Sequence, residues 1–531
     1  MLKILLATFA ILGCARAAEK MERWVYIPAN FQVEAEAARV NGLLERAAAA
    51  GYTHALVQDS KFSRLTTVTR QYFPNVETVK ATAKRLGIEI VPAVFPVGYS
   101  NDLLFHDRNL AEGLPVKDAL FEVKDGIAKI VADPPVTLPG TASRAGWDFV
   151  DETLTPEDGA MRANPLEGNA RLHERVKVSP FRQYHLSVSI RSEKLSGGKP
   201  EIKALGKDGR SLQWTNLAVK PNQSWTRYDV TFNSLDNDEV SVYFGVWGGH
   251  RGTVWWRDTA IEECGPVNLL RRKGTPLTIK RDGGGELTEG KDFEPVTNPL
   301  TGSKPWPGCF TAWHEAPVIR VKNIADGTKL RVSYFHTHII YDEQICGCVE
   351  EPAFQNLLRD QAKEVVKLWG SKTNFMSHDE WRVLGWDDAC KGKPPAGIAA
   401  DNLKLCTDIL RKEAPGGRIL VWNDMYDPFH NAKKDYYLAN GSLEKSWEGL
   451  TPGVEIMNWN FGKRDESLAF FSGRGHSQLI AGFYDGDLSD VDAWLASAAK
   501  VKGVRGFMYT TWKQDYSQLE AVAQKLVESG W

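Results

Sequence analysis

The sequence has no excess of charge of either sign. Its 65 Lys and Arg residues are balanced by 67 Asp and Glu residues, for a formal net charge of −2. Sequence-independent binding to nucleic acid needs a field of positive charge, so nucleic acid is not an expected partner. Beyond the first residues, no run is apolar enough to cross a bilayer. The 43% hydrophobic and 25% charged residues exclude a disordered chain, a collagen-like chain and a polytopic membrane protein.

Aromatic residues, in contrast, are plentiful: 18 Trp, 15 Tyr and 22 Phe. Flat apolar rings stack on sugar rings as readily as they fill cores, so carbohydrate is a candidate ligand. The 531 residues are too many for one simple core and indicate two or three domains.

The first 17 residues have the pattern of an export signal. Lys3 precedes a short apolar run, Ile4–Leu12, and then Ala15-Arg16-Ala17, which is typical of a cleavage site. Ile11-Leu12-Gly13-Cys14 also resembles a bacterial lipobox, in which Cys14 would carry a lipid anchor. We therefore expect an exported bacterial protein that is periplasmic, extracellular or lipid-anchored at the cell surface.

Removal of the signal leaves six cysteines, enough for three disulfides in an exported protein. Their connectivity cannot be read from the sequence. Cys346-Gly-Cys348 could bind a metal ion, but the sequence has no second pair of closely spaced cysteines. A disulfide or a buried thiol is therefore favoured. The residue types predict no metal and no cofactor. A disulfide from Cys390 to Cys346 or Cys348 would pin the loops around the predicted site.

The chain begins and ends with an α/β pattern. Apolar runs at Trp24–Ile27, Tyr52–Asp59 and Ile88–Phe95 alternate with helical periodicity, which is typical of a parallel sheet covered on both faces. Five further strands are predicted after residue 370: Thr373–Glu380, Arg418–Asp424, Val454–Asn460, Gln478–Tyr484 and Val504–Thr511.

Between about Pro135 and Pro266 the hydrophobic period is two, with glycine-rich turns between the runs, as in an antiparallel β-sandwich. The sequence therefore predicts a (β/α)8 TIM barrel interrupted after strand 3 by a β-sandwich. The predicted segments are a signal peptide (1–17), the first part of the barrel (18–134), the inserted sandwich (135–328) and the second part of the barrel (329–531). Leu330–His336 would be a ninth strand and is assigned to the insert or to a lid. An open doubly wound sheet is the alternative, but no G-x-G-x-x-G follows the first strand.

Polar and aromatic residues gather where the predicted barrel strands end. Barrel enzymes place their active sites there, and carboxylates, amides and aromatic faces together are suited to binding sugars. Glu380 is the candidate proton donor for glycosidic cleavage. The other candidates are Asp59, His378, Asp379, Trp422, Asp424, Trp459, Tyr484, Asp485, Trp512 and Gln514.

Several of these residues have plainer interpretations. Trp422 and Trp459 could simply fill the barrel mouth, and Asp424 could cap the next helix. Asp379 and Glu380 could form an ion-pair set with Arg382. Because adjacent strand residues point to opposite faces, both carboxylates can reach one substrate only if the strand has given way to a loop there.

Ser377-His378-Asp379-Glu380 resembles the Asp-Glu pair of glycoside hydrolase family 20, the exo-acting β-N-acetylhexosaminidases. Similar correspondences are found for Val91-Pro92-Ala93 with Gly98-Tyr99-Ser100, Trp422-Asn423-Asp424-Met425, Trp459, Tyr484, and Trp512-Lys513-Gln514, where Gln replaces Glu. The resemblance implies substrate-assisted, retaining hydrolysis. Asp379 would orient the acetamido nitrogen, Tyr484 would donate to the acetamido oxygen, and Glu380 would protonate the leaving oxygen. Two features depart from the family: Ser377-His378 replaces Gly-Gly, and Ile27-Pro28-Ala29 stands where a sugar-binding Arg is expected.

The insert resembles carbohydrate-binding modules of families 4 and 9. Trp225-Thr226-Arg227-Tyr228 and Trp255-Trp256-Arg257-Asp258 are similar to their late strands, and Trp214 and Trp247 are its candidate sugar-binding residues.

Three other functions remain open. One is a retaining glycosidase that uses Asp485 or Asp424 as nucleophile. Another is a metal-dependent hydrolase or deacetylase built from His336 and His338 with His378 and Asp379. The last is a non-catalytic glycan-binding protein.

Overall fold

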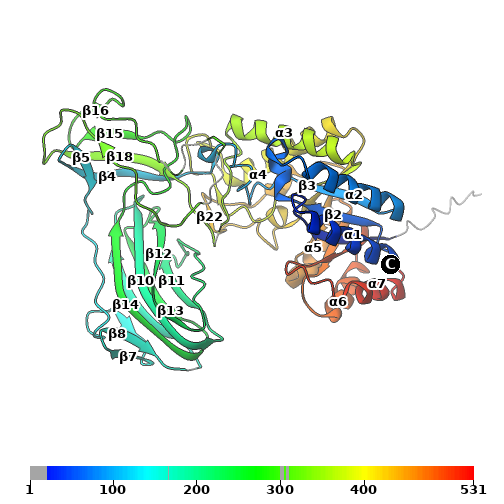
Figure 1. The fold of residues 1–531 in the computed structure, drawn as a ribbon, viewed down its shortest axis with the longest axis horizontal. Coiled ribbons are helices and arrows are strands. Elements are labelled where there is room, and N and C mark those ends of the chain that lie inside the picture. Colours follow the sequence, from blue (N-terminus) through cyan, green and yellow to red (C-terminus); the bar gives the residue numbers. More distant parts are fainter. Residues whose placement is uncertain (1–20, 166, 299, 301–303, 306–309, 342) are drawn as a thin grey trace, which may run out of the picture.

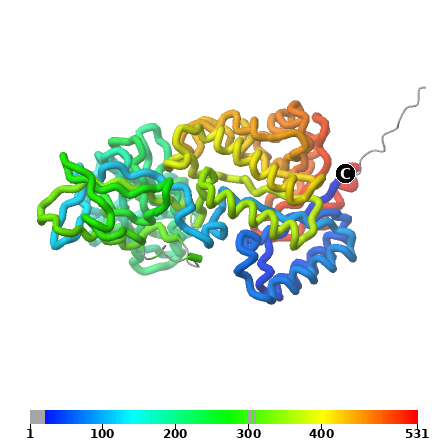
Figure 2. The backbone as a smooth tube through the Cα atoms, turned by 90° about the horizontal axis from the view of Figure 1, so that it is seen from above, coloured from blue at the N-terminus to red at the C-terminus, as the bar shows by residue number. Residues whose placement is uncertain are grey.

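The computed structural model describes residues 21–165, 167–298, 300, 304–305, 310–341 and 343–531. The predicted signal peptide, Cys14 and Cys309 lie outside these residues. A barrel lies at one end of the molecule and antiparallel sheets lie at the other (Figures 1 and 2). Within the described chain, no helix combines the length and the hydropathy needed to cross a membrane.

Eight parallel strands close into a barrel, in the order of the chain, which confirms the predicted parallel barrel and excludes the open doubly wound sheet. The strands are β1 (Glu22–Pro28), β2 (His54–Gln58), β3 (Glu89–Val94), β19 (Thr373–Met376), β21 (Arg418–Trp422), β23 (Val454–Asn458), β24 (Gln478–Phe483) and β25 (Val504–Thr510).

Helices follow seven of the eight strands and cover the outside of the barrel (Figure 1). They are α1 (Glu34–Ala49), α2 (Tyr72–Leu86), α3 (Pro352–Trp369), α4 (Pro395–Glu413), α5 (Arg464–Gly473), α6 (Leu488–Ala498) and α7 (Leu519–Glu528). After β21 the place of the helix is taken by short 3-10 turns, including η4 (Asp424–Tyr426) and η5 (Ser446–Gly449). η5 packs on α4 and so fills the gap in the helical ring.

Three antiparallel sheets are built from strands between β3 and β19 in the sequence. A five-stranded sheet has the order β12 (Gln223–Asn233), β10 (Gln183–Ser196), β14 (Arg251–Glu263), β8 (Ala160–Ala163) and β7 (Leu154–Glu157). A four-stranded sheet has the order β11 (Pro200–Leu205), β13 (Glu239–Val246), β9 (Ala170–Lys177) and β6 (Phe149–Val150). Inward residues of both sheets, such as Val188 of β10 and Val242 of β13, belong to one apolar cluster.

The third sheet joins segments far apart in the sequence and lies above the other two in Figure 1. Its order is β16 (Glu286–Leu287), β15 (Thr278–Arg281), β18 (Lys329–His336), β4 (Leu114–Lys124), β5 (Ile127–Ile130) and β17 (Ile319–Arg320). The run Leu330–His336 is therefore a strand of this sheet and not of the barrel. The boundaries drawn at 134/135 and 328/329 pass through this sheet, because β15 pairs with β18 and β17 pairs with β5. A small parallel pair, β20 (Val383–Leu384) with β22 (Leu438–Ala439), links two loops at the barrel mouth.

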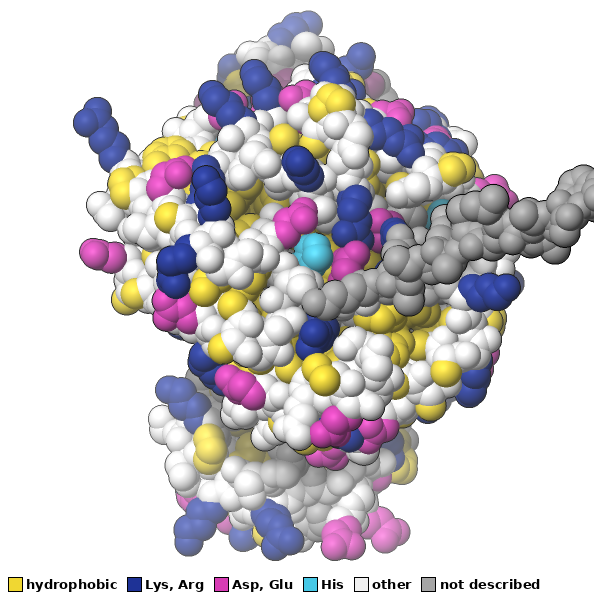
Figure 3. Space-filling model, turned by 90° about the vertical axis from the view of Figure 1, so that its right-hand side faces the viewer, with side chains coloured by type: hydrophobic (Ala, Val, Ile, Leu, Met, Phe, Trp, Pro, Cys, Tyr) yellow, Lys and Arg dark blue, Asp and Glu magenta, His cyan; other side chains and the backbone are white. Residues whose placement is uncertain are grey.

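The barrel interior is packed with apolar side chains, including Trp24, Leu56, Phe375 and Met457. Such a packed interior leaves the loops after the strands as the place for a site. On the face of the molecule seen in Figure 3, basic and acidic side chains are interspersed, in keeping with the balanced charge of the sequence.

Candidate active site

A cavity of about 370 Å³ opens at the C-terminal ends of the barrel strands. Each of the eight strands, or the loop that follows it, contributes to the lining. In strand order, the lining residues are Tyr26, Gln58, Tyr99, Asp379 with Glu380, Trp422, Trp459, Tyr484 and Trp512. Seven of these nine side chains are aromatic or amide, and the other two are carboxyl groups.

The two carboxyl groups reach the same cavity because the strand that precedes them ends early. β19 stops at Met376, short of Asp379 and Glu380, although the sequence predicted a strand that runs to Glu380. Glu380 has a left-handed backbone, with φ of 48°, which breaks the alternation of a strand. The backbone of this loop also lies against Gly98, where a Cβ atom would stand 2.1 Å from the carbonyl oxygen of Asp379. Only glycine fits at that position, so Gly98 allows the loop to sit where it does.

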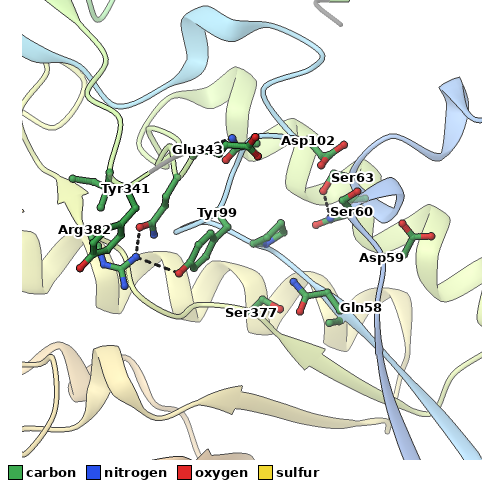
Figure 4. Close-up of a pocket in the computed structure, with 16 residues that line it drawn as sticks. Gln58, Asp59, Ser60, Ser63, Tyr99, Asp102, Tyr341, Glu343, Ser377 and Arg382 are labelled. Carbon is green, nitrogen blue, oxygen red and sulfur yellow. Dashed lines mark hydrogen bonds between the residues drawn. The ribbon is translucent and has the colours of Figure 1, made fainter. Parts of the chain in front are cut away.

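Glu380 is held by two neighbours. Arg382 Nη2 lies 2.6 Å from Glu380 Oε1, and the Tyr99 hydroxyl donates to Glu380 Oε2. Arg382 Nη1 in turn donates to the Tyr99 oxygen at 3.2 Å and to Gln344 Oε1, as the dashed lines in Figure 4 show. The ion pair with Arg382 that the sequence left open is therefore present, but Glu380 still faces the cavity. A charge-assisted network of this kind fixes the orientation of the carboxylate.

Asp379 lies in a different electrostatic environment. Burial, and then the nearby carboxylates of Asp424 and Glu380, raise the pKa of Asp379 well above its usual range. Burial likewise raises the pKa of Asp424 to about 7. Asp424 Oδ2 accepts from the Glu380 backbone N–H at 2.8 Å and from Asn431 Nδ2 at 2.9 Å, while Oδ1 is buried with no hydrogen-bond partner. Two neighbouring carboxyl groups that are costly to ionise are typical of catalytic sites.

The aromatic residues form a continuous wall. Trp459 and Tyr484 stack with ring centroids 5.6 Å apart and planes 6° apart, and Trp512 meets Tyr484 edge-on at 5.5 Å. Trp422 lies at the base, 4% exposed, where it packs on Phe375 and on Trp459. Trp422 thus fills the barrel mouth and lines the cavity at once. Tyr484 and Trp512, 39% and 42% exposed, offer their faces to a ligand.

An unusual turn presents Tyr484 to the cavity. Phe483, Tyr484 and Asp485 all have positive φ values, of 66°, 53° and 60°. Three such non-glycine residues in a row are costly and persist only where the surroundings hold them. Asp485 supplies that support: it accepts from the Thr511 hydroxyl and from the backbone N–H of Trp512 at 2.8 Å and Lys513 at 3.1 Å. Both of its oxygens are therefore engaged with the next loop, and Asp485 does not line the cavity.

Four other predicted site residues also lie outside the central cavity. Asp59 is buried and accepts from Phe31 N, Lys61 N and the Tyr72 hydroxyl, so it shapes the loop after β2. His378 is buried, bonds Asn402 through Nε2 at 3.1 Å, and has a pKa lowered by burial to about 4. Asp424 lies behind the two lining carboxyls, and Gln514 is exposed in the loop after β25.

The histidines proposed for a metal-dependent hydrolase are not brought together. His336 ends β18, where its ring nitrogens contact Gln183 and Asn233, and His338 is buried two residues further on. Among the described residues, the one cluster with metal-ligand chemistry contains none of His336, His338, His378 and Asp379. The ligand set expected for this alternative is therefore not assembled, because β18 belongs to the six-stranded sheet and not to the barrel.

Two further cavities adjoin the site. One of about 480 Å³ is lined by Gln58 and Tyr99, which it shares with the central cavity, and by Asp59, Arg382 and Tyr341 (Figure 4). The other, of about 800 Å³, lies over the four-stranded sheet, and its lining includes Trp214, Trp247 and Tyr243. Tyr341 lines both of these cavities. Tyr341 is therefore the side chain that the cavity over the four-stranded sheet shares with the cavity next to the central one.

Several residues of the site were not predicted as site residues. Tyr26 and Gln58 point inward from β1 and β2, and the inward alternation of those strands was the available signal. Tyr341 and Gln344 come from the loop after the six-stranded sheet, and no local pattern in the sequence indicates that this loop reaches the barrel.

The fold and the cavity thus define a parallel α/β barrel with a carboxylate and aromatic site. No protein-family model matches the chain, and no curated protein matches it either. Solved structures with weak similarity include a rhamnosidase from Novosphingobium sp. PP1Y, at 9% identity and a TM-score of 0.33, covering 96% of this chain and 58% of that one. An exo-beta-agarase has 8% identity and a TM-score of 0.23, covering 78% of this chain and 100% of that one. A structure titled "CBM4 structure and function" has 16% identity and a TM-score of 0.18, covering 23% of this chain and 83% of that one.

Proposed function

We propose that this protein is a glycoside hydrolase that cleaves glycosidic bonds in the central cavity of its barrel, with Asp379 and Glu380 as its catalytic carboxyl groups. The observation that carries the proposal is the joint lining of one cavity by these two carboxyls and by Trp422, Trp459 and Trp512. Carboxyls supply the proton and the charge that an oxocarbenium-like transition state needs, and aromatic faces hold a sugar ring. The cavity is near the lower end of the usual range for ligand pockets, which suits an enzyme that takes one terminal sugar.

The same cavity favours a substrate-assisted mechanism. Among the described residues that line it, the only carboxyl groups are Asp379 and Glu380, which are adjacent in the chain. A two-carboxylate mechanism needs a second carboxyl across the sugar ring. The two candidates for that role are otherwise engaged, because Asp424 lies behind the lining and Asp485 holds the next loop. A substrate with a 2-acetamido group brings its own nucleophile, the carbonyl oxygen.

In this mechanism each lining residue has a defined part. Glu380 protonates the leaving oxygen and then activates water. Asp379 accepts from the acetamido N–H, and its carboxylate, costly in the empty site, is stabilised when positive charge develops on that nitrogen. Tyr484 donates its hydroxyl proton to the acetamido oxygen. The protein is accordingly proposed to be exo-acting and β-N-acetylhexosaminidase-like.

One observation favours a second assignment of the two carboxyls. Arg382 and Tyr99 bind the Glu380 carboxylate, whereas the pKa of Asp379 is raised by its surroundings. A carboxyl that is costly to ionise, next to a carboxylate that is bound by a cation, is typical of an acid next to an anion. In this second assignment Asp379 is the proton donor and the Glu380 carboxylate stabilises the positive charge of the transition state.

Aryl glycosides with and without a 2-acetamido group distinguish these assignments. For the substrate-assisted mechanism we expect turnover of the 2-acetamido substrates only, competitive inhibition by a thiazoline mimic of the cyclised intermediate, and a sharp loss of rate in Asp379→Asn. Tyr484→Phe keeps the ring stacked on Trp459 and removes only the hydroxyl, so it is the matched control for the donor role. A loss of rate that depends on the leaving group in Asp379→Asn and not in Glu380→Gln would support the second assignment. Absence of turnover on every glycoside, with glycan binding retained, would contradict both.

The proposal also includes that the enzyme is bacterial, is exported from the cell and acts on an oligo- or polysaccharide. The export pattern at residues 1–17 supports it, and so does the cavity over the four-stranded sheet with Trp214 and Trp247, where a glycan chain could continue from the barrel.

A further inference from the structure

Four buried side chains with metal-ligand chemistry meet beside the barrel mouth, outside the cavity described above. They are Glu112, Cys348, Asp387 and Cys390, which are at most 2% exposed. One ligand atom of each, a sulfur or a carboxylate oxygen, lies within 4.8 Å of the corresponding atoms of the other three. The four residues come from three separate loops, one before β4, one before α3 and one between β20 and α4.

Three of the six separations between these atoms match the edges of a small tetrahedron, and the other three are at most 4.8 Å. Cys348 Sγ and Cys390 Sγ are 3.9 Å apart, Cys348 Sγ is 3.4 Å from Asp387 Oδ1, and Cys390 Sγ is 3.6 Å from Glu112 Oε2. Tetrahedral zinc with bonds of about 2.3 Å to sulfur and about 2.0 Å to oxygen requires sulfur–sulfur edges of about 3.8 Å and sulfur–oxygen edges of about 3.5 Å. The observed edges differ from these values by about 0.1 Å.

N–H donors hold both carboxylates in place, and Asp387 Oδ1, the oxygen that faces Cys348, also accepts from the backbone N–H of Ala389 at 3.1 Å. Glu112 Oε1 accepts from the backbone N–H of Trp386 at 2.7 Å and of Asp387 at 3.3 Å. Asp387 Oδ2 accepts from Arg272 Nη2 at 2.5 Å and from Gly113 N at 3.4 Å. Outer partners of this kind orient the ligands of a metal site.

The charges in the cluster are complementary to a dication. Among the described residues, Arg272 is the one cation that forms an ion pair with the cluster, through Asp387, and it is shared with Glu351 and with the carbonyl oxygens of Asn109 and Ala111. Two carboxyl groups buried beside one shared guanidinium can both ionise at little cost only if a further cation joins them, because buried charge is costly unless it is paired or bound to a metal.

We propose that Glu112, Cys348, Asp387 and Cys390 form a structural zinc site. Binding would displace the protons of the two thiols and the proton of Glu112, whose pKa burial raises to about 8, with no change in oxidation state. Four protein ligands in a closed, buried site are typical of structural and not catalytic zinc. The ion would tie together three loops, including the loop between β19 and α4 that carries Glu380 and Arg382. It would thereby fix that loop relative to β4 of the six-stranded sheet.

The spacing of the cysteines in the sequence suggested a different pair of metal ligands. Cys346-Gly-Cys348 is the close pair in the sequence, but Cys346 Sγ turns away toward the carbonyl oxygen of Gly98, at 3.5 Å. The partner of Cys348 is Cys390, 42 residues further along the chain. The sulfurs of this pair are not bonded to each other, and the rival occupant of the position is the disulfide between them that the sequence predicted.

The test is metal analysis of the whole protein, exported from cells grown with zinc and purified without chelator. We expect about one zinc per chain in the wild type and in Cys406→Ser, a matched control in which a buried cysteine of α4 outside the cluster is changed. Cys348→Ser and Cys390→Ser should contain little zinc. Glu112→Gln keeps both thiols but removes one ligand. Loss of an outer partner lowers metal affinity by roughly 10–100-fold, and we expect Glu112→Gln to lower zinc affinity by more than that.

Two measurements on the wild type do not depend on the folding of any variant. Replacement of the metal by Co²⁺ should give the near-ultraviolet thiolate-to-cobalt band and the intense visible bands of a tetrahedral site. A chelator should lower Tm, and added Zn²⁺ should restore it. The proposal is overturned if the protein contains no stoichiometric zinc and gives no thiolate–cobalt band. It is equally overturned if peptide mapping finds Cys348 and Cys390 joined as a disulfide.

Discussion

Arg382 and Glu380 form an ion pair at the entrance to the central cavity, with Nη2 and Oε1 2.6 Å apart. The guanidinium also lies near the rings of Tyr341 and Tyr437, at 5.1 and 4.9 Å from their centroids. Its side chain is only 7% exposed. A buried cation that binds one cavity-lining carboxylate therefore positions that carboxylate as well as balancing its charge.

Replacement of Arg382 by lysine should impair turnover without unfolding the protein. Lysine keeps the charge but cannot bind Glu380, Tyr99 and Gln344 at once with a rigid fork. A hydrogen bond to a charged group is worth about 1.5–3 kcal/mol, so kcat should fall by roughly 10–100-fold. Arg359→Lys, at an exposed position of α3, is the control. Unchanged kcat in Arg382→Lys would show that the pair does not position Glu380 for catalysis.

Glu380→Gln should separate substrates by their leaving groups. If Glu380 is the proton donor, its loss should slow cleavage of poor leaving groups by about 10²–10⁴-fold and affect activated aryl glycosides much less. The measurement is kcat/KM across a series of leaving groups, with Asp379→Asn in parallel. The same loss for all leaving groups would remove Glu380 from the donor role, and a leaving-group dependence in Asp379→Asn alone would transfer that role to Asp379.

Asp424→Asn should stabilise the protein in a pH-dependent way. The folded-state pKa of Asp424 is raised to about 7, whereas an unfolded Asp titrates near 3.9. Between these values the folded state holds a proton that the unfolded state has lost, so this group lowers stability as pH rises from about 4 to 7. Asparagine removes that titration and keeps an oxygen for the Glu380 N–H.

The gain in Tm from Asp424→Asn should therefore be several degrees at pH 7.5 and close to zero at pH 4.5, as followed by thermal unfolding. Asp360→Asn, on the exposed face of α3, is the control. An equal change in Tm at both pH values would mean that Asp424 is not held protonated by its surroundings.

Trp247→Ala should weaken binding of long glycans and spare small substrates. Trp247 lines the cavity over the four-stranded sheet, away from the carboxyls, and packs against Lys203 and Tyr243. Loss of one aromatic contact of about 0.5–1.5 kcal/mol should raise Kd for a polysaccharide by roughly 2–10-fold. Turnover of small aryl glycosides should not change. Phe73→Ala, at an exposed aromatic residue on α2, is the control, and equal glycan binding by all three proteins would contradict a role for this cavity.

The sequence by itself determined the barrel and most of the cavity lining. The eight strands are apolar runs in an α/β pattern. This local pattern is sufficient to identify them, because strands that are buried on both faces are apolar along their whole length. The side chains that follow parallel strands meet at one end of a barrel. Strand order along the chain is therefore enough to group Asp379, Glu380, Trp422, Trp459, Tyr484 and Trp512.

Tertiary structure decided which strand-end residues face the cavity and which groups from distant loops meet. β19 gives way to a loop after Met376, and the left-handed backbone at Glu380 turns two adjacent carboxyls to one side, whereas Asp485 and Asp59 turn toward neighbouring loops. These directions depend on backbone conformations and contacts that no periodic pattern encodes. Glu112 and Cys390, 278 residues apart, meet only because the barrel closes and β4 pairs with β18 beside it. Hydrophobic period is a local property of the chain, but a site made of several loops exists only once the chain has folded.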